Sequence, residues 1–279
     1  MSDNQTQSKT AQEPSKDQVL IQVNQLDSAY GERKILKGIE LSVKQGEILV
    51  IMGGSGSGKS TLLKNMLGLM QPTRGEIIID KMNINTVDKQ QMLKLRRTMG
   101  VAFQGGALLS SMSVGDNIKL PLRQHTDLDE STISIMTRLK LELMNLAGFE
   151  DLMPSELSGG MLKRAGLARA VIMDPKILFF DEPSAGLDPV TSVELDQLIL
   201  ELRKAMNMTI IVVTHELESA FTIADRIAVL YDGEIVKTGT VEEIKACDDE
   251  RVANLINRKP REVQIDGEKY LSRLTEGAE

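Results

Sequence analysis

EILVIMGGSGSGKS, residues 47–60, joins an apolar run directly to a loop of glycine and serine. The loop fits the pattern G-x-x-x-x-G-K-[ST] in the context where that pattern binds phosphate, between an apolar strand and a helix. Glycines let backbone N–H groups close on phosphate oxygens, the lysine reaches the β- and γ-phosphates, and the serine hydroxyl ligates Mg²⁺. The stretch therefore predicts a site for a nucleoside triphosphate and Mg²⁺. Its expected nucleotide-binding residues are Gly53, Gly54, Ser55, Gly56, Ser57, Gly58, Lys59, Ser60 and Thr61.

Further strands and helices alternate on both sides of this loop. Apolar runs predict strands at 19–26, 39–43, 75–80 and 101–104, and later in KILFFDEP, TIIVVTHE and RIAVLYDG. From 104 to about 174 the chain reads as mostly helical, with a central helix near 131–147 that we expect Gly148 to cap. Such alternation indicates an α/β sheet, here with a helical block inserted between two strands.

Polar side chains follow several of these strands. ILFFDE ends in two acids, of which Asp181 is placed to hold Mg²⁺ and Glu182 to accept a proton from attacking water. His215 follows TIIVVT and is predicted either to orient that water or Glu182, or simply to bond a backbone group. Gln104 offers an amide oxygen to the metal. Tyr30 either stacks on adenine or only packs at the rim of the site.

LSGGMLKRAGLARA, residues 157–170, predicts a second place where an anion could bind. Apolar residues recur at helical spacing behind a Ser-Gly-Gly start. Ser158, Gly159 and Gly160 stand where free backbone N–H groups and the helix dipole attract anions. The alternative is an ordinary capped helix start.

Composition narrows the class of protein. The 279 residues are 41% hydrophobic and 26% charged, which is typical of a globular chain. Residues 1–18 are polar and lack an apolar signal core, so we expect a disordered tail on a protein that stays in the cytoplasm. A net charge of −7 argues against broad binding to nucleic acid, and no nucleic-acid partner is expected.

In their order along the chain, these motifs resemble those of ATP-binding cassette (ABC) ATPases, the nucleotide-binding subunits of ABC transporters. The matching positions are Tyr30 (A-loop), 53–60 (Walker A), Gln104 (Q-loop), 157–161 (signature), 177–182 (Walker B), 184–188 (D-loop) and His215 (switch histidine). The resemblance implies an α/β P-loop NTPase core over residues 19–240, with an inserted α-helical subdomain at about 105–174 and an N-terminal antiparallel β-subdomain. It implies ATP hydrolysis with Glu182 and His215 as the catalytic pair. Mg²⁺ would lie near Ser60, Gln104 and Asp181.

The same resemblance implies a role for the second anion site at 158–160. In this family the signature of one subunit caps the γ-phosphate of ATP held by another. A second copy of the chain would therefore complete the site in trans with Ser158, Gly159, Gly160 and Asp188. Met161 departs from the glutamine usual in the family and cannot make that side chain's hydrogen bonds.

Three segments narrow the resemblance to the ATPases of Mla-type phospholipid transporters, which maintain outer-membrane lipid asymmetry. They are FQGGALLSSMSVGDNIKLPLRQHT (103–126), the signature with its methionine, and DDERVANLINR (248–258). The resemblance implies a peripheral protein on the cytoplasmic face of the inner membrane, acting with an MCE-domain protein and a small STAS-domain protein. An integral permease would bind at about 104–126, where Leu108, Leu109, Met112 and Val114 are the expected contacts. Without the resemblance, an internal helix of the lobe is an equally good interpretation of this stretch.

Residues 241–279 extend beyond the minimal cassette. We expect one or two short helices and then a polar tail, in which Tyr270, Leu271 and Leu274 form either a docking segment or part of a disordered end. Two other functions remain open from the sequence. One is the ATPase of a different ABC importer or exporter, and the other is a soluble ABC ATPase without a permease.

Overall fold

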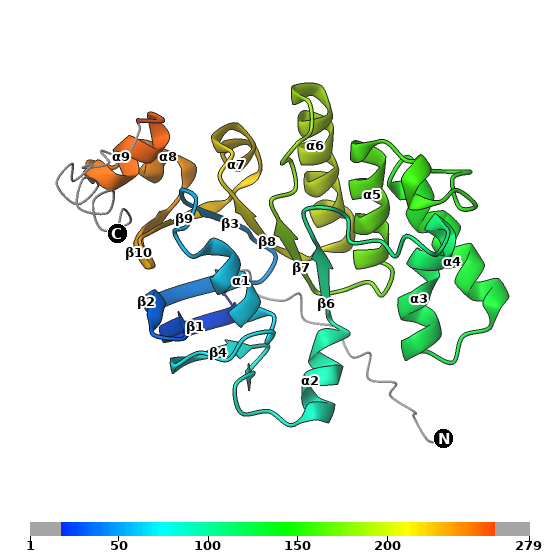
Figure 1. The fold of residues 1–279 in the computed structure, drawn as a ribbon, viewed down its shortest axis with the longest axis horizontal. Helices are drawn as coiled ribbons and strands as arrows, with labels where there is room; N and C mark the ends of the chain where they lie inside the picture. The colour runs from blue at the N-terminus through cyan, green and yellow to red at the C-terminus, as the bar shows by residue number, and fades with distance from the viewer. Residues whose placement is uncertain (1–17, 260–279) are drawn as a thin grey trace, which may run out of the picture.

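The computed structural model describes residues 18–259, and its centre is a six-stranded sheet in the order β10-β9-β3-β8-β7-β6 (Figure 1). Strands β9 to β6 run parallel, while β10 is antiparallel to β9. The bounds are β3 Ile48–Met52, β6 Met99–Ala102, β7 Ile177–Asp181, β8 Thr209–Thr214, β9 Arg226–Tyr231 and β10 Glu234–Gly239. Strand β3 is fully buried, as its unbroken apolar run predicts for the middle of a parallel sheet.

A second, antiparallel sheet lies beside the first and has the order β2-β1-β4-β5. Its bounds are β1 Val19–Tyr30, β2 Arg33–Lys44, β4 Arg74–Ile79 and β5 Met82–Asn83. Alternate residues of β3 divide the interior into two cores. Leu49 and Ile51 pack with this antiparallel sheet, and Val50 packs with the helices of the opposite face. The expected fold class, a P-loop α/β core with an antiparallel β-subdomain, is therefore confirmed.

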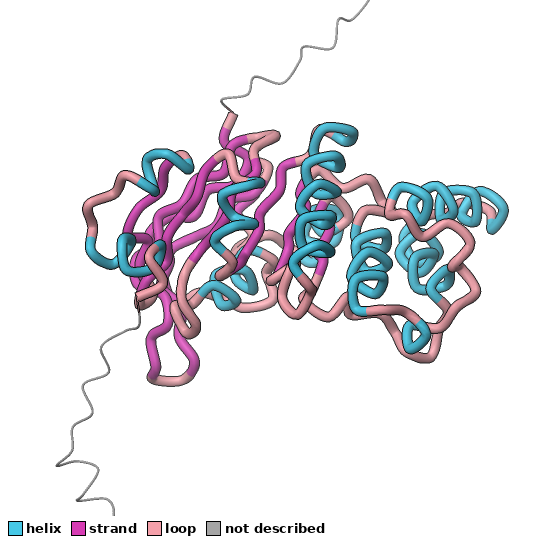
Figure 2. Tube along the Cα trace, turned by 90° about the horizontal axis from the view of Figure 1, so that it is seen from above, coloured by secondary structure: helices cyan, strands magenta, loops and turns pink. Residues whose placement is uncertain are grey.

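Nine α-helices and one short 3₁₀ helix lie within the described residues, some against the sheets and some in a separate lobe (Figure 2). Helices α3 to α5, inserted between β6 and β7, form a lobe at one end of the molecule, and α8 and α9 lie at the other end (Figure 1). The bounds are α1 Lys59–Met66, α2 Lys89–Arg96, α3 Val114–His125, α4 Glu130–Leu143, η1 Pro154–Glu156, α5 Gly159–Ala170, α6 Pro189–Met206, α7 Leu217–Ile223, α8 Val241–Lys245 and α9 Glu250–Ile256.

The structure corrects the sequence prediction at the central helix of the lobe. Helix α4 ends at Leu143 rather than near 147, and Gly148 is not its cap. The chain reverses at Asn145, whose φ of 56° is left-handed, so that Leu146 returns to the core and its N–H bonds the Leu141 carbonyl at 2.8 Å. Burial of Leu146 thus stops the helix before the glycine. The prediction also missed α2, β5 and β10 and began β2 too late.

One expected permease contact is also wrong. Val114 begins α3 and is fully buried because its side chain packs in the hydrophobic core, and its N–H donates to the Leu152 carbonyl at 2.8 Å. Leu109 is exposed, while Leu108 packs against the core. The expected tail with Tyr270, Leu271 and Leu274 and most of the expected N-terminal tail lie outside the described residues. Among residues 18–259, no helix is both long and apolar enough to cross a bilayer.

Candidate functional site

The residues predicted to bind phosphate and metal and to catalyse hydrolysis follow strands that end at one edge of the parallel sheet. Neighbouring strands are in register there, with Ala102 opposite Phe180, Asp181 opposite Val213, and Met52 opposite Thr214. Carboxyl ends of parallel strands meet at one edge, where ligands bind in open α/β sheets. Glu182, His215 and Gly53 directly follow three of these strand ends, and Gln104 lies two residues beyond the end of β6.

The phosphate loop joins β3 to α1 through a tightly packed backbone. Gly58 has a φ of 109°, a conformation that a residue with a Cβ rarely adopts. At Gly53 a Cβ would lie 2.3 Å from the Leu230 carbonyl oxygen, so only glycine fits there. The side chain of Ser57 is buried, and its Oγ has no hydrogen-bond partner among the described residues. These features leave a loop of backbone N–H groups in front of the N-terminus of α1, which favours an anion.

Lys59 is the first residue of α1 and is 8% exposed. Its Nζ donates to the carbonyls of Gly53 at 2.8 Å and Gly54 at 3.2 Å, and lies 3.7 Å from Glu182 Oε1. Burial lowers the pKa of Lys59, while the charges of Glu182 and Asp181 oppose that shift. A cation is thus held inside the loop, where phosphate oxygens could replace the two carbonyls.

Glu182 and His215 are in direct contact. The Nδ1 atom of His215 lies 2.8 Å from Glu182 Oε2, and the His215 backbone N–H donates to the same oxygen at 3.3 Å. Glu182 has a left-handed φ of 50°, which turns its side chain away from the direction of Asp181. Its own N–H still bonds the Val213 carbonyl at 2.8 Å, so the strained residue remains anchored to β8. The arrangement holds one carboxylate oxygen by the histidine and the other near Lys59.

Asp181, Ser60 and Gln104 carry oxygen donors of the kind that Mg²⁺ prefers. Burial, and next the charge of Glu182, raise the pKa of Asp181. A cation beside it would relieve this excess of negative charge. Within residues 18–259 no three His, Cys, Asp or Glu side chains form a metal cage. Mg²⁺ is usually bound by one or two carboxylates together with substrate phosphates and water. The Asp181 carboxylate, the Ser60 hydroxyl and the Gln104 amide oxygen are therefore a suitable donor set.

Tyr30 ends β1 at the tip of a hairpin, and its side chain is 51% exposed. The following strand, β2, passes close to the phosphate loop. A Cβ on Gly58 would lie only 2.8 Å from Cδ2 of Leu36 in that strand. An exposed ring on this hairpin is free to stack on a flat ligand.

The residues predicted to act in trans line a separate cleft. Ser158, Gly159, Gly160 and Asp188 border an open cleft of about 380 Å³ at the N-termini of α5 and α6. Both polar side chains also cap these helices locally. Ser158 Oγ accepts from the Met161 N–H at 3.3 Å, and Asp188 Oδ1 accepts from the Val190 and Thr191 N–H groups at 3.1 Å.

Two features of the site were missed by the sequence analysis. The C-terminal end of α9 helps to line an open cleft of about 520 Å³ with Gly54, Ser55 and His215. Arg258, just after α9, bonds Glu218 at 3.3 Å in this cleft. The second feature is Lys163 on α5, which bonds the backbone just beyond Glu182. Neither contact leaves a periodic or motif signal in the sequence.

Comparisons with known proteins show the family to which the chain is similar. A family model described as ABC transporter matches residues 36–185. The intermembrane phospholipid transport system ATP-binding protein MlaF of Haemophilus influenzae is 40% identical over 262 residues, covering 93% of this chain and 99% of that protein. The probable ribonucleotide transport ATP-binding protein mkl of Mycobacterium tuberculosis is 41% identical over 239 residues, covering 86% and 67%. A solved dimeric ATP-binding cassette in a post-hydrolysis state, bound to ADP and Pi, is 32% identical with a TM-score of 0.74, covering 80% and 99%.

Proposed function

Since this chain belongs to the ABC transporter family, and is therefore an ATP-hydrolysing enzyme, we propose that it powers the movement of phospholipids between the inner and outer membranes. The observation that carries the lipid assignment is its similarity to MlaF along almost the full length of both chains. The site geometry supports the chemistry. The phosphate loop, the paired acids and the histidine all follow strands at one sheet edge, which supports phosphoryl transfer as the reaction.

In the proposed reaction, the backbone N–H groups of residues 53–61 bind the phosphates of ATP, and Lys59 leaves the carbonyls of Gly53 and Gly54 to bind them too. Glu182 accepts a proton from the attacking water. His215 fixes the direction of the Glu182 carboxylate through their 2.8 Å contact. Mg²⁺, held by Ser60, Gln104 and Asp181, would supply neutralising charge on the phosphates. Tyr30 would stack on adenine.

We further propose that the working unit is a homodimer. The 158–160 cleft and the cleft beside the phosphate loop share no lining residue. Each chain therefore carries the two halves of an ATP site at separate places, and two chains are needed to bring a pair of halves together. A helix N-terminus with free N–H groups suits the γ-phosphate of a neighbour's ATP. The solved cassette that matches this chain is itself dimeric, which supports the arrangement. The rate of ATP hydrolysis should then rise with the square of protein concentration when the subunits are dilute.

The permease is proposed to bind near residues 104–126, on the cytoplasmic face of the inner membrane. Leu109 is 46% exposed in this segment and gives a membrane partner an apolar contact. An MCE-domain protein and a STAS-domain protein complete the proposed complex. The name of the mycobacterial relative favours a second candidate, an ABC transporter with a different cargo such as a ribonucleotide.

The test is to tag the chain in its own host, solubilise the membranes in mild detergent, and identify the proteins and lipids that co-purify by mass spectrometry. Recovery of a permease, an MCE-domain protein and phospholipid would support the lipid assignment. A permease with a solute-binding protein would favour the second candidate, and a chain without any membrane partner would overturn both. Leu109→Asp should abolish recovery of the permease, whereas the control Leu139→Asp, at a 59% exposed site on α4, should not.

A further inference from the structure

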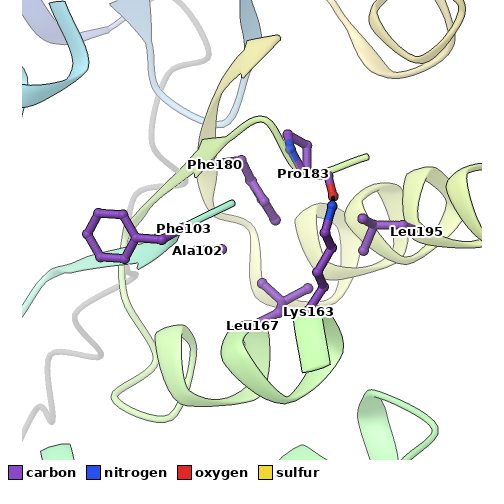
Figure 3. Close-up of a pocket in the computed structure, with 7 residues that line it drawn as sticks. All are labelled: Ala102, Phe103, Lys163, Leu167, Phe180, Pro183 and Leu195. Carbon is purple, nitrogen blue, oxygen red and sulfur yellow. Dashed lines mark hydrogen bonds between the residues drawn. The ribbon is translucent and has the colours of Figure 1, made fainter. Parts of the chain in front are cut away.

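Lys163 connects the helix that begins at the signature with the segment that follows Glu182, two parts of the molecule that have separate roles in the proposed mechanism. It lies in the second turn of α5, the helix that begins at the signature. Its Nζ donates to the carbonyl of Pro183 at 2.6 Å and to that of Ala185 at 2.5 Å. Figure 3 shows the side chain reaching from α5 to Pro183. These carbonyls belong to the segment that directly follows Glu182 and leads to Asp188.

The surroundings of Lys163 hold it in this position. Its stem lines a small cavity together with Leu167, Phe180 and Leu195 (Figure 3). Burial lowers the pKa of Lys163, with the charges of Glu216 and Glu182 acting in the opposite direction. A partly buried ammonium needs hydrogen-bond partners, and the two carbonyls supply them. The contact is therefore a fixed one rather than a mobile surface pair.

Helices α5 and α6 are also held together at the signature cleft. Arg164 bonds Glu194 at 2.5 Å, and a Cβ on Gly160 would lie 2.8 Å from Thr191 Cγ2. Lys163 adds the link from this pair of helices to the backbone beside Glu182. Lys163 thus connects the signature, which would contact ATP bound to a neighbouring chain, with Glu182, which would act on ATP bound to its own chain.

We propose that Lys163 is a positioning residue that transmits the engagement of the signature by a second subunit to Glu182, and so couples the two ATP sites. The inference rests on the homodimer of the proposed function. The ATP bound by the partner subunit draws the start of α5 toward that ATP. Lys163 then moves residues 183–185 together with the helix, because both of its hydrogen bonds end on backbone carbonyls of that segment. Glu182 is one peptide bond from that segment and moves with it.

The test compares Lys163→Met, Lys163→Arg and the control Lys140→Met. Methionine keeps the stem but removes both hydrogen bonds, and arginine restores donors to the two carbonyls. Lys140 is another lysine of the lobe with a low exposure, but it pairs with Asp174, away from the Glu182 segment. For each variant we would measure the melting temperature, ATP affinity at dilute protein, kcat and the Hill coefficient for ATP.

For Lys163→Met we expect ATP affinity within about twofold of the wild type, kcat lowered roughly 5- to 100-fold, and a Hill coefficient near 1. Lys163→Arg should recover most of the loss, and Lys140→Met should match the wild type. In a Glu182→Gln background, Lys163→Met should also weaken ATP-dependent dimerisation by about tenfold.

A wild-type kcat and Hill coefficient in Lys163→Met would overturn the proposal. So would a loss of kcat accompanied by equal losses of ATP affinity and melting temperature, since that pattern marks a merely structural role. Failure of the homodimer itself is distinguishable. In that case the wild type would already lack cooperativity and the quadratic dependence on protein concentration.

Discussion

Replacing Glu182 by glutamine should change ATP binding and ATP hydrolysis in opposite directions. Glutamine has nearly the same shape and can keep the contacts with His215, which now involve Oε2 at 2.8 and 3.3 Å. It cannot accept a proton from water. Loss of a general base costs about 10²- to 10⁴-fold in rate, so kcat should fall by that factor.

The same change should strengthen ATP binding. Glu182 Oε1 lies 3.7 Å from Lys59 Nζ, and the two side chains are 15% and 8% exposed. A pair of unit charges near this distance interacts by about 1 kcal/mol in water and about 4 kcal/mol at an effective dielectric constant of 20. Neutralising Glu182 frees Lys59 for phosphate and removes a repulsion with the triphosphate. We therefore expect a gain of at least about 1 kcal/mol, or roughly fivefold in affinity.

The assay combines single-turnover hydrolysis, ATP titration and analytical ultracentrifugation with and without ATP. Because ATP remains uncleaved, Glu182→Gln should accumulate as a dimer when ATP is present. Glu218→Gln is the matched control, since Glu218 lines the neighbouring cleft at 93% side-chain exposure and bonds Arg258 rather than Lys59. A kcat within threefold of the wild type, without an ATP-dependent dimer, would refute the assignment of Glu182 as the base.

Three further predictions follow from single contacts. Lys59→Met should lower ATP affinity by roughly 10²- to 10⁴-fold, the value of two charge-assisted hydrogen bonds of about 1.5–3 kcal/mol each, and an ATP titration with unchanged affinity would contradict this. Tyr30→Ala should weaken ATP binding by about 1–2 kcal/mol while Tyr30→Phe preserves it, since stacking needs only the ring; equal losses in both variants would argue against stacking. Asp196 is 4% exposed and accepts a hydrogen bond from Ser219 Oγ at 2.5 Å. Burial raises the pKa of Asp196, so the folded protein loses stability as the pH rises through that pKa and the carboxyl becomes charged. Asp196→Asn should accordingly melt a few degrees higher than the wild type at pH 8, at about 2–4 °C per kcal/mol, and the difference should vanish below the ordinary aspartate pKa near 4.

The sequence by itself determined the class of the fold and predicted the chemistry of the site. The phosphate loop, the acids that end β7 and the apolar run of β3 are local patterns, and each depends on residues adjacent in the chain. Strand order was not needed to predict that Lys59, Asp181 and Glu182 serve one ligand. Carboxyl ends of parallel strands share one edge in any such sheet.

Tertiary structure decided the features that depend on contacts between residues far apart in the sequence. Val114 follows the capping residue of α3 in the sequence and yet is buried, because the fold packs its side chain into the hydrophobic core. Helix α4 stops at Leu143 because the core takes in Leu146. Lys163 finds its two carbonyls about twenty residues along the chain, at positions where any amino acid would present the same backbone oxygen. A side chain that binds backbone leaves no signature at its partner, and for that reason such a link becomes visible only in the folded chain.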